Sequence, residues 1–371
     1  MVDKMAVMLQ NHGHEVAFYR ETTEGVRDSL TGKINGFFCG LYSRRGVKGM
    51  REALEREKPD VVNVHNLYPF ISPAALFECR KRGVPVVMTV HNYRLICPTG
   101  LFMRNGKPCE HCLKSGNEWG CIRYNCEHSL LKSIGYAARN AMARWSRAYR
   151  DCVDRFVCLT EFQRQKLIEA GFEAERITVI PNSVDVRCKK DEGKCDTSYV
   201  AYLGRLSYEK GYDLLFEVAR RHPEIEFRFA GAVREKTTVA IPDNVKLMGY
   251  LKGQELEQFL QGCRSLVMPS RCYEGFPMAI LEAAQYGKPA IGPNHGGFTE
   301  IIGQGNDAIG KLFEPGNVDD LERQVVDLWN DSLSCQQLGD KAFEKLKRAY
   351  STEVVGGQWE LLLEEVVNRK R

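Results

Sequence analysis

Residues 199–221, YVAYLGRLSYEKGYDLLFEVARR, decide the fold, because a short apolar run passes directly into an amphipathic helical pattern. The run at 199–204 predicts a strand, and a tight turn that carries Arg205 and Lys210 comes just before the predicted helix. A helix N-terminus offers unbonded N–H groups and positive potential, so two cations beside it suit a diphosphate. A solvated loop with two unpaired cations is the alternative interpretation.

The same alternation of short β-branched runs and helical patterns continues along the whole chain, which indicates parallel sheets built from βαβ units. Seven further runs predict strands, at 59–66, 84–92, 154–160, 177–182, 226–231, 245–250 and 265–270.

A length of 371 residues favours two domains. A turn signal and a polar stretch after Ile180 place the boundary between residues 1–183 and 184–354. A final helix at about 355–371 follows, and its Gly356-Gly357 pair would let it bend back towards the first half.

Bulk composition excludes several classes of protein. With 43% hydrophobic and 27% charged residues, the chain is typical of a soluble globular protein. It has no apolar run of about 18 residues and no secretory signal pattern, so we expect the cytoplasm. A net charge of +4 is too small to indicate a nucleic-acid partner.

The start of the chain departs from the usual order of such a fold. Val2, Met5, Met8 and Leu9 lie on one helical face, Gly13 is a helix stop, and 14–20 predicts a strand. A doubly wound sheet normally has a central strand before that first helix. None precedes it here, so either the sequence starts late or the first sheet has a gap.

Residues 272–291, CYEGFPMAILEAAQYGKPAI, place an acid on an otherwise apolar helix predicted to begin at Pro277. A buried carboxylate is rare unless it is paired, and Glu282 with its two acceptor oxygens suits the vicinal diol of a ribose. Glu274 and the N–H groups around Gly275 and Phe276 would face a neighbouring sugar or phosphate. For Glu282, a salt bridge to a core arginine is the alternative.

Two strands of the first half end in the same dipeptide, His65-Asn66 and His91-Asn92. Ligands of open α/β sheets bind beyond the carboxyl ends of the strands. The repetition therefore favours a functional role over that of two unrelated solvated histidines.

The motifs GRLSYEKG (204–211) and PSRCYEGFPMAILEAAQYGKPAIG (269–292) together resemble the family 4 retaining glycosyltransferases of GT-B fold. The resemblance continues in order through nearly the whole chain, for example in TVHNYRLICP, ITVIPNSVD and NHGGFTEII. It implies two Rossmann-like, doubly wound parallel-sheet domains that face each other across a cleft. The family's first strand and its glycine-rich loop, which precede GHEV, are missing here, so a noncatalytic nucleotide-sugar-binding protein is one alternative.

The resemblance implies a role for each motif residue. Arg205 and Lys210 look like the cations that bind a nucleotide-sugar diphosphate, and Glu282 looks like the acceptor for the ribose hydroxyls. The other matching positions are Glu274 at the donor sugar, His91 near the sugar and its phosphate, and Gly231 and Leu251 around the base.

The implied reaction moves a glycosyl group from a nucleotide diphosphate sugar to a hydroxyl of a glycan, a lipid-linked saccharide or another acceptor. The anomeric configuration would be retained, and catalysis would need no metal. Cations near the departing phosphate would stabilise its growing negative charge. A sugar epimerase or a phosphorylase of the same fold is a further alternative.

A cysteine-bearing insertion occupies residues 97–128, after the second His-Asn strand. Its one C-x2-C pair and nearby cysteines are typical of a zinc knuckle or ribbon. In the similar insertions of some family 4 enzymes, the usual positions correspond to Cys97, Cys109, Cys112 and Cys126. A structural zinc ion, unliganded buried thiols and a redox or iron–sulfur role all remain open.

Residues 130–156 mix Arg, Trp and Tyr with apolar residues at helical spacing. Such a segment could rest peripherally on an anionic membrane surface and reach a lipid-linked acceptor. An ordinary helix packed on the sheet is the alternative.

Overall fold

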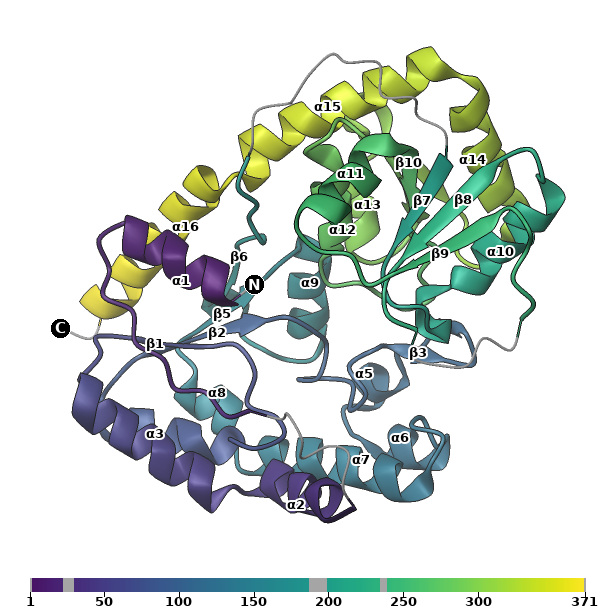
Figure 1. Ribbon diagram of the computed structural model, residues 1–371. Helices are drawn as coiled ribbons and strands as arrows, with labels where there is room; N and C mark the ends of the chain where they lie inside the picture. Colours follow the sequence, from purple (N-terminus) through teal and green to yellow (C-terminus); the bar gives the residue numbers. More distant parts are fainter. Residues whose placement is uncertain (1, 23–29, 187–198, 234–238, 370–371) are drawn as a thin grey trace. The chain divides into compact units, whose positions relative to one another are not determined.

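The structure is a computed structural model that describes residues 2–22, 30–186, 199–233 and 239–369 (Figure 1). The chain divides into two compact units. Unit 1 contains residues 1–102, 110–181 and 356–371, and unit 2 contains residues 103–109 and 182–355. The polar stretch that led us to place a boundary near residue 183 lies largely at 187–198, outside the described residues.

Unit 1 is built on a parallel sheet in the order β1-β2-β5-β6. Each of its strands falls within a run that the sequence predicted as a strand: β1 (Val62–Val64), β2 (Val86–Val90), β5 (Arg155–Cys158) and β6 (Ile177–Val179). Every residue of β2 and β5 is buried, as expected of parallel strands with both faces covered.

Helices surround this sheet (Figure 1). They are α1 (Val2–Asn11), α2 (Leu30–Leu41), α3 (Arg44–Glu57), α4 (Leu76–Lys81), α5 (His111–Ser115), α6 (Trp119–Arg123), α7 (Leu130–Trp145), α8 (Ala148–Cys152) and α9 (Glu161–Glu169). The helix predicted at the start is confirmed as α1, which ends before Gly13 at φ +86°. The strand predicted over 14–20 is wrong: no described strand pairs with this extended segment, and an isolated extended chain lacks the ladder that defines a strand.

The last helix, α16 (Thr352–Asn368), continues through Gly356-Gly357, so the glycine pair forms no turn. Gly356 instead permits a close approach: a Cβ there would lie 2.5 Å from Nε2 of His12, at the end of α1. His12 Nδ1 also lies 3.2 Å from a carboxylate oxygen of Glu360. These contacts join the two ends of the chain within unit 1.

Unit 2 contains a six-stranded parallel sheet in the order β12-β11-β10-β7-β8-β9. Its strands are β7 (Tyr199–Leu203), β8 (Glu226–Ala230), β9 (Val245–Gly249), β10 (Cys263–Val267), β11 (Ala290–Pro293) and β12 (Gly310–Phe313). The first strand in the chain, β7, lies centrally and the order reverses between β7 and β10. This is the doubly wound order in which a ligand binds at the reversal point.

Two apolar clusters hold unit 2 together, each with residues from the sheet and from helices that pack on it. The helices are α10 (Tyr212–Arg221), α11 (Gln254–Gly262), α12 (Met278–Ala284), α13 (Gly297–Ile302), α14 (Val318–Asn330) and α15 (Ser332–Tyr350). A short hairpin from the cysteine insertion, β3 (Met103–Arg104) with β4 (Lys107–Pro108), also belongs to unit 2. Among the helices of the described residues, none is both long and apolar enough to cross a membrane.

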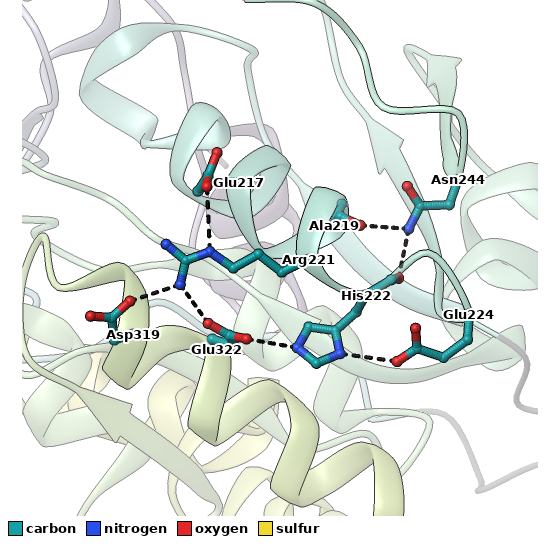
Figure 2. Close-up of polar contacts among 8 residues, drawn as sticks. All are labelled: Glu217, Ala219, Arg221, His222, Glu224, Asn244, Asp319 and Glu322. Carbon is teal, nitrogen blue, oxygen red and sulfur yellow. Dashed lines mark hydrogen bonds and ion pairs between the residues drawn. The ribbon is translucent and has the colours of Figure 1, made fainter.

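A polar network joins the end of α10 to the start of α14 (Figure 2). Arg221 contacts Asp319 at 2.7 Å and Glu322 at 2.6 Å. The two ring nitrogens of His222 lie 2.9 Å from Glu224 and 2.8 Å from Glu322. Partial burial acts to lower the pKa of His222, but these two carboxylates outweigh it and raise the pKa above its usual value.

This network predicts a pH-dependent contribution to stability. A histidine whose pKa is raised by folding contributes fully below its unfolded pKa of about 6.5, and the contribution is lost as pH rises through the folded pKa. We expect His222→Gln to lower the free energy of unfolding by about 0.5–1 kcal/mol near pH 6 and by less near pH 9. Urea unfolding at both pH values measures this, with His128→Gln on an exposed site as the control. Equal losses at both pH values would contradict the prediction.

Candidate functional site

The candidate site lies at the carboxyl ends of β7 and β10, where the order of the sheet in unit 2 reverses. The loop after β7 carries Arg205 and Lys210, and the loop after β10 carries Glu274. Because the two strands are neighbours, with Ala201 opposite Leu266, their loops meet at one edge of the sheet. The fold therefore brings together three residues that the sequence predicted separately.

The loop after β7 is held in a fixed conformation. A short 3-10 turn, Tyr208–Lys210, precedes Gly211, which caps α10 at φ +68°. A Cβ on Gly211 would lie 1.9 Å from the Pro269 carbonyl oxygen, so only glycine lets the two loops approach this closely. Lys210 is thereby placed two residues before the first residue of the helix, Tyr212.

Lys210 and Glu274 form an ion pair, with side chains 18% and 15% exposed. The Ser270 hydroxyl donates to the same carboxylate oxygen at 2.8 Å. Burial would raise the pKa of Glu274, but Lys210 and Ser270 outweigh it and hold that pKa below its usual range. Burial would likewise lower the pKa of Lys210, but Glu274 outweighs it and raises that pKa. Both groups are therefore charged near neutral pH.

Arg205 is more accessible than Lys210, because 41% of its side chain is exposed. Its guanidinium lies 3.4 Å from the carboxylate of Glu209. A second arginine, Arg271, was not predicted, and it makes two hydrogen bonds of 2.6 Å to the carboxylate of Asp213. The backbone N–H of Arg271 also donates to the backbone carbonyl of Glu209 at 2.9 Å. Arg271 therefore fastens the loop after β10 to the start of α10. The sequence offered no signal that Arg271 and Asp213 would pair.

The helix predicted to begin at Pro277 is α12, with Pro277 as its N-cap and Met278 as its first residue. Glu282 is only partly exposed, while its neighbours Leu281 and Ala283 are fully buried. Sequence reasoning thus placed an acid correctly on a largely buried helix.

The remaining predicted residues of the loop after β10 lie beside a second loop. Gly275 is buried and Phe276 is partly buried, with its ring 5.8 Å from that of Tyr350. The Gly297 N–H donates to the Glu274 carbonyl at 2.9 Å, which joins the start of α13 to this loop. The backbone around Glu274 is therefore fixed from both sides.

Gly231 follows β8 at φ +151°, and its N–H donates to the Gly249 carbonyl at 2.7 Å. A Cβ at this position would lie 1.8 Å from the Gly204 carbonyl oxygen. Leu251 follows β9 and packs against an apolar cluster of unit 2. Gly231 therefore has a steric function, and a contact of either residue with a base stays a prediction.

His91 belongs to unit 1, where it directly follows β2. Its Nε2 lies 2.8 Å from Nδ1 of His65, which directly follows β1, and the two rings stack at 5.1 Å. The repeated His-Asn dipeptides are thus neighbours in space. A donor contact of His91 stays a prediction.

The cysteine insertion gives limited support to a metal site. Cys97, Cys112 and Cys126 belong to unit 1, whereas Cys109 belongs to unit 2. In the part of the chain that the structure describes, no three His, Cys, Asp or Glu side chains are arranged to hold a metal ion. Cys121, which was not among the four predicted metal positions, is buried, and a hydrogen bond with Cys126 raises its pKa, with further contributions from burial, Cys112 and Cys97. The zinc site stays a prediction.

Comparison with known proteins identifies the family. The model described as "Glycosyltransferase Family 4" matches residues 1–187, and "Glycosyl transferases group 1" matches residues 188–345. Sulfoquinovosyl transferase of Arabidopsis thaliana is 25% identical, over 97% of this chain and 67% of the relative. The Staphylococcus aureus poly(ribitol-phosphate) alpha-N-acetylglucosaminyltransferase is 27% identical, over 66% of this chain and 50% of the relative.

Solved structures confirm the fold. Anabaena HepE, in complex with UDP-glucose, superposes with a TM-score of 0.65 at 16% identity, over 98% of this chain and 89% of HepE. Sucrose-phosphate synthase of Thermosynechococcus elongatus gives 0.65 at 14% identity, over 94% and 81% of the two chains. The predicted α/β class and GT-B fold are confirmed. The chain belongs to the family 4 glycosyltransferases of GT-B fold.

Proposed function

We propose that this protein transfers a glycosyl group from a nucleoside diphosphate sugar to a hydroxyl of a saccharide or lipid-linked acceptor, with retention and without a catalytic metal. The observation that carries the proposal is the pairing of Lys210 with Glu274 at the reversal point of the sheet. A cation beside a helix N-terminus suits a diphosphate, and the adjacent carboxylate suits sugar hydroxyls.

The chemistry expected of these residues is electrostatic. As the bond to the sugar breaks, negative charge grows on the departing diphosphate, and Lys210 and Arg205 would stabilise it. In the structure, Lys210 pairs with Glu274. A bound diphosphate would therefore share Lys210 with Glu274, whose carboxylate would turn towards the sugar. The half-buried Glu282 would accept hydrogen bonds from the ribose.

A panel of nucleotide sugars tests this function. Relatives include a protein solved with UDP-glucose, so UDP-sugars come first, followed by GDP- and dTDP-sugars. A bound donor at about 100 times its Kd should stabilise the protein by about 2.7 kcal/mol in thermal unfolding. Product NMR should show the donor's anomeric configuration, and EDTA should leave the rate unchanged. An inverted product would refute retention, and a rate that EDTA abolishes while the protein stays folded would refute metal-independent catalysis.

We further propose that helix α7 rests on an anionic membrane surface. Its exposed face is apolar: Leu131 is 80% exposed, Ile134 38%, Met142 42% and Trp145 70%. Its opposite face buries polar Ser133 instead. The helix contains no acidic residue, and its Lys132 is exposed, which suits anionic lipid headgroups, whereas Arg139 is buried and Arg144 pairs with Glu118.

Vesicle sedimentation checks this prediction. We expect the double variant Leu131→Glu, Trp145→Glu to bind phosphatidylglycerol vesicles at least about tenfold more weakly than the unmodified protein, because two apolar side chains no longer insert. Leu361→Glu, which alters a leucine on α16 that is 70% exposed, should bind normally. Equal losses in both variants, or no loss in either, would contradict the proposal.

We also propose a structural zinc ion in the cysteine insertion. The mutual influence of Cys121, Cys126, Cys112 and Cys97 supports a thiol cluster, but the arrangement of the described side chains does not by itself fit a metal. Mass-spectrometric metal analysis of purified protein decides the matter: about one zinc per chain is expected, and its absence after purification under reducing conditions refutes the site.

A further inference from the structure

His65 and His91 form a direct side-chain contact that the proposed reaction does not explain. β1 and β2 are parallel neighbours, with Val64 opposite Met88, and each histidine is the first residue after its strand. The two side chains line one small cavity together with Asn92 and Tyr149. His65 Nδ1 and His91 Nε2 are 2.8 Å apart, which is an ordinary hydrogen-bond distance.

The two asparagines of the repeated dipeptides have a different function. Asn66 Oδ1 accepts a hydrogen bond from the Tyr68 N–H at 3.3 Å, and Asn92 Oδ1 accepts one from the Arg94 N–H at 3.0 Å. Each asparagine therefore caps its own loop two residues onward, as Asx turns do. The asparagines shape the two loops, and the histidines bond to each other.

The protonation of the pair follows from its surroundings. Burial, with a contribution from His91, lowers the pKa of His65 to about 4, and burial also lowers the pKa of His91. Both rings are thus neutral near pH 7, and each has one N–H and one bare nitrogen. One hydrogen bond between two neutral imidazoles holds a single proton, so the tautomer of one ring determines that of the other.

We propose that His65 is a positioning residue that fixes the ring orientation and the tautomer of His91. The inference rests on the proposed function and on the role that the family resemblance implies for His91, near the donor sugar and its phosphate. With Nε2 engaged by His65, His91 keeps only Nδ1 for a substrate, and the tautomer of His65 determines whether that Nδ1 carries a proton. A histidine held in one tautomer needs no reorganisation when the sugar is transferred.

Three substitutions of His65 separate positioning from packing. Asparagine places an amide atom close to the position of Nδ1, glutamine places one close to the position of Nε2, and leucine places no polar atom at either. The bond to His91 uses Nδ1. We therefore expect His65→Asn to keep kcat within about threefold, whereas His65→Gln and His65→Leu lower it by about tenfold or more.

The split between kcat and KM identifies the role. The KM for the donor should stay within about twofold in all three variants, because His65 is not proposed to contact the donor. Asn66→Ala, which removes the adjacent loop cap, is the matched control and should keep kcat. If asparagine, glutamine and leucine lower kcat equally, or if asparagine is the worst, the inference is refuted. Should the leucine variant fail to fold, asparagine against glutamine still decides.

A second measurement does not depend on activity. In the full chain with isotope-labelled histidine, NMR of the ring nitrogens should show both imidazoles neutral near pH 7, each in one tautomer, with one proton between His65 and His91. His65→Leu should release His91 into a mixture of tautomers. A mixture of tautomers in the unmodified protein refutes the inference. If the pair shows one tautomer but no nucleotide sugar is turned over, only the proposed function fails.

Discussion

Lys210→Met is expected to lower kcat by about 10²- to 10³-fold, by analogy with the loss of a single oxyanion-stabilising donor. The lysine stands two residues before the first residue of α10, and its side chain is largely buried. Lys210 pairs directly with Glu274, whereas Arg205 pairs with Glu209. Steady-state kinetics measure the effect, with the donor that the panel of nucleotide sugars selects.

The same substitution leaves the Glu274 carboxylate buried without its cation. Removing one partner of a buried ion pair costs about 3–5 kcal/mol, so the single variant should also unfold at a lower temperature. The double variant Lys210→Met, Glu274→Gln should regain most of that stability and remain inactive. Stability recovered together with activity would show that Lys210 serves only the fold.

An exposed lysine provides the matched control for this experiment. Lys246, on β9 of the same unit, pairs with Glu226 and has 58% of its side chain exposed. Lys246→Met should leave kcat and the melting temperature nearly unchanged, because exposed ion pairs contribute little. A value of kcat for Lys210→Met within about threefold of the unmodified protein would refute the assignment of Lys210 to the diphosphate.

Gly231→Ala is expected to destabilise unit 2 by at least about 4 kcal/mol, a loss large enough to be diagnostic of a specific steric conflict. The added Cβ would lie 1.8 Å from the Gly204 carbonyl oxygen, and backbone rather than a flexible side chain would have to move. The φ of +151° adds strain for any residue other than glycine. Thermal and urea unfolding measure the loss.

Gly249 is the matched control for this second prediction. It also has a positive φ, +70°, but no atom lies within 4 Å of an added Cβ. Gly249→Ala should therefore cost only about 1 kcal/mol from backbone strain. Similar losses in the two variants would show that the contact at Gly204 yields easily. Gly231→Ala would then become a fair probe of base binding.

The sequence alone determined the α/β class, because period and composition specify strands without reference to distant residues. Eight of the nine runs predicted as strands contain strands, and the helix stop at Gly13 and the helix start at Pro277 were local signals of the same kind. The GT-B fold was predicted from the family resemblance, which depends on short contiguous motifs such as 204–211. The failure at 14–20 has the same origin: an extended pattern does not become a strand without a partner, and local sequence does not reveal whether the partner exists.

Only the tertiary structure decided which of these residues are neighbours. Lys210 and Glu274 are separated by 64 residues, and they pair because the sheet order places β7 next to β10. His65 and His91 meet for the same reason at β1 and β2, and only the structure shows that the apolar face of α7 is exposed. Strand order is set by the packing of whole layers of helices and strands. The free energy of that packing comes from many residues, so no single motif determines the order. The motifs therefore predicted Lys210 and Glu274 as charged residues of the site, and the topology of the sheet brings the two together.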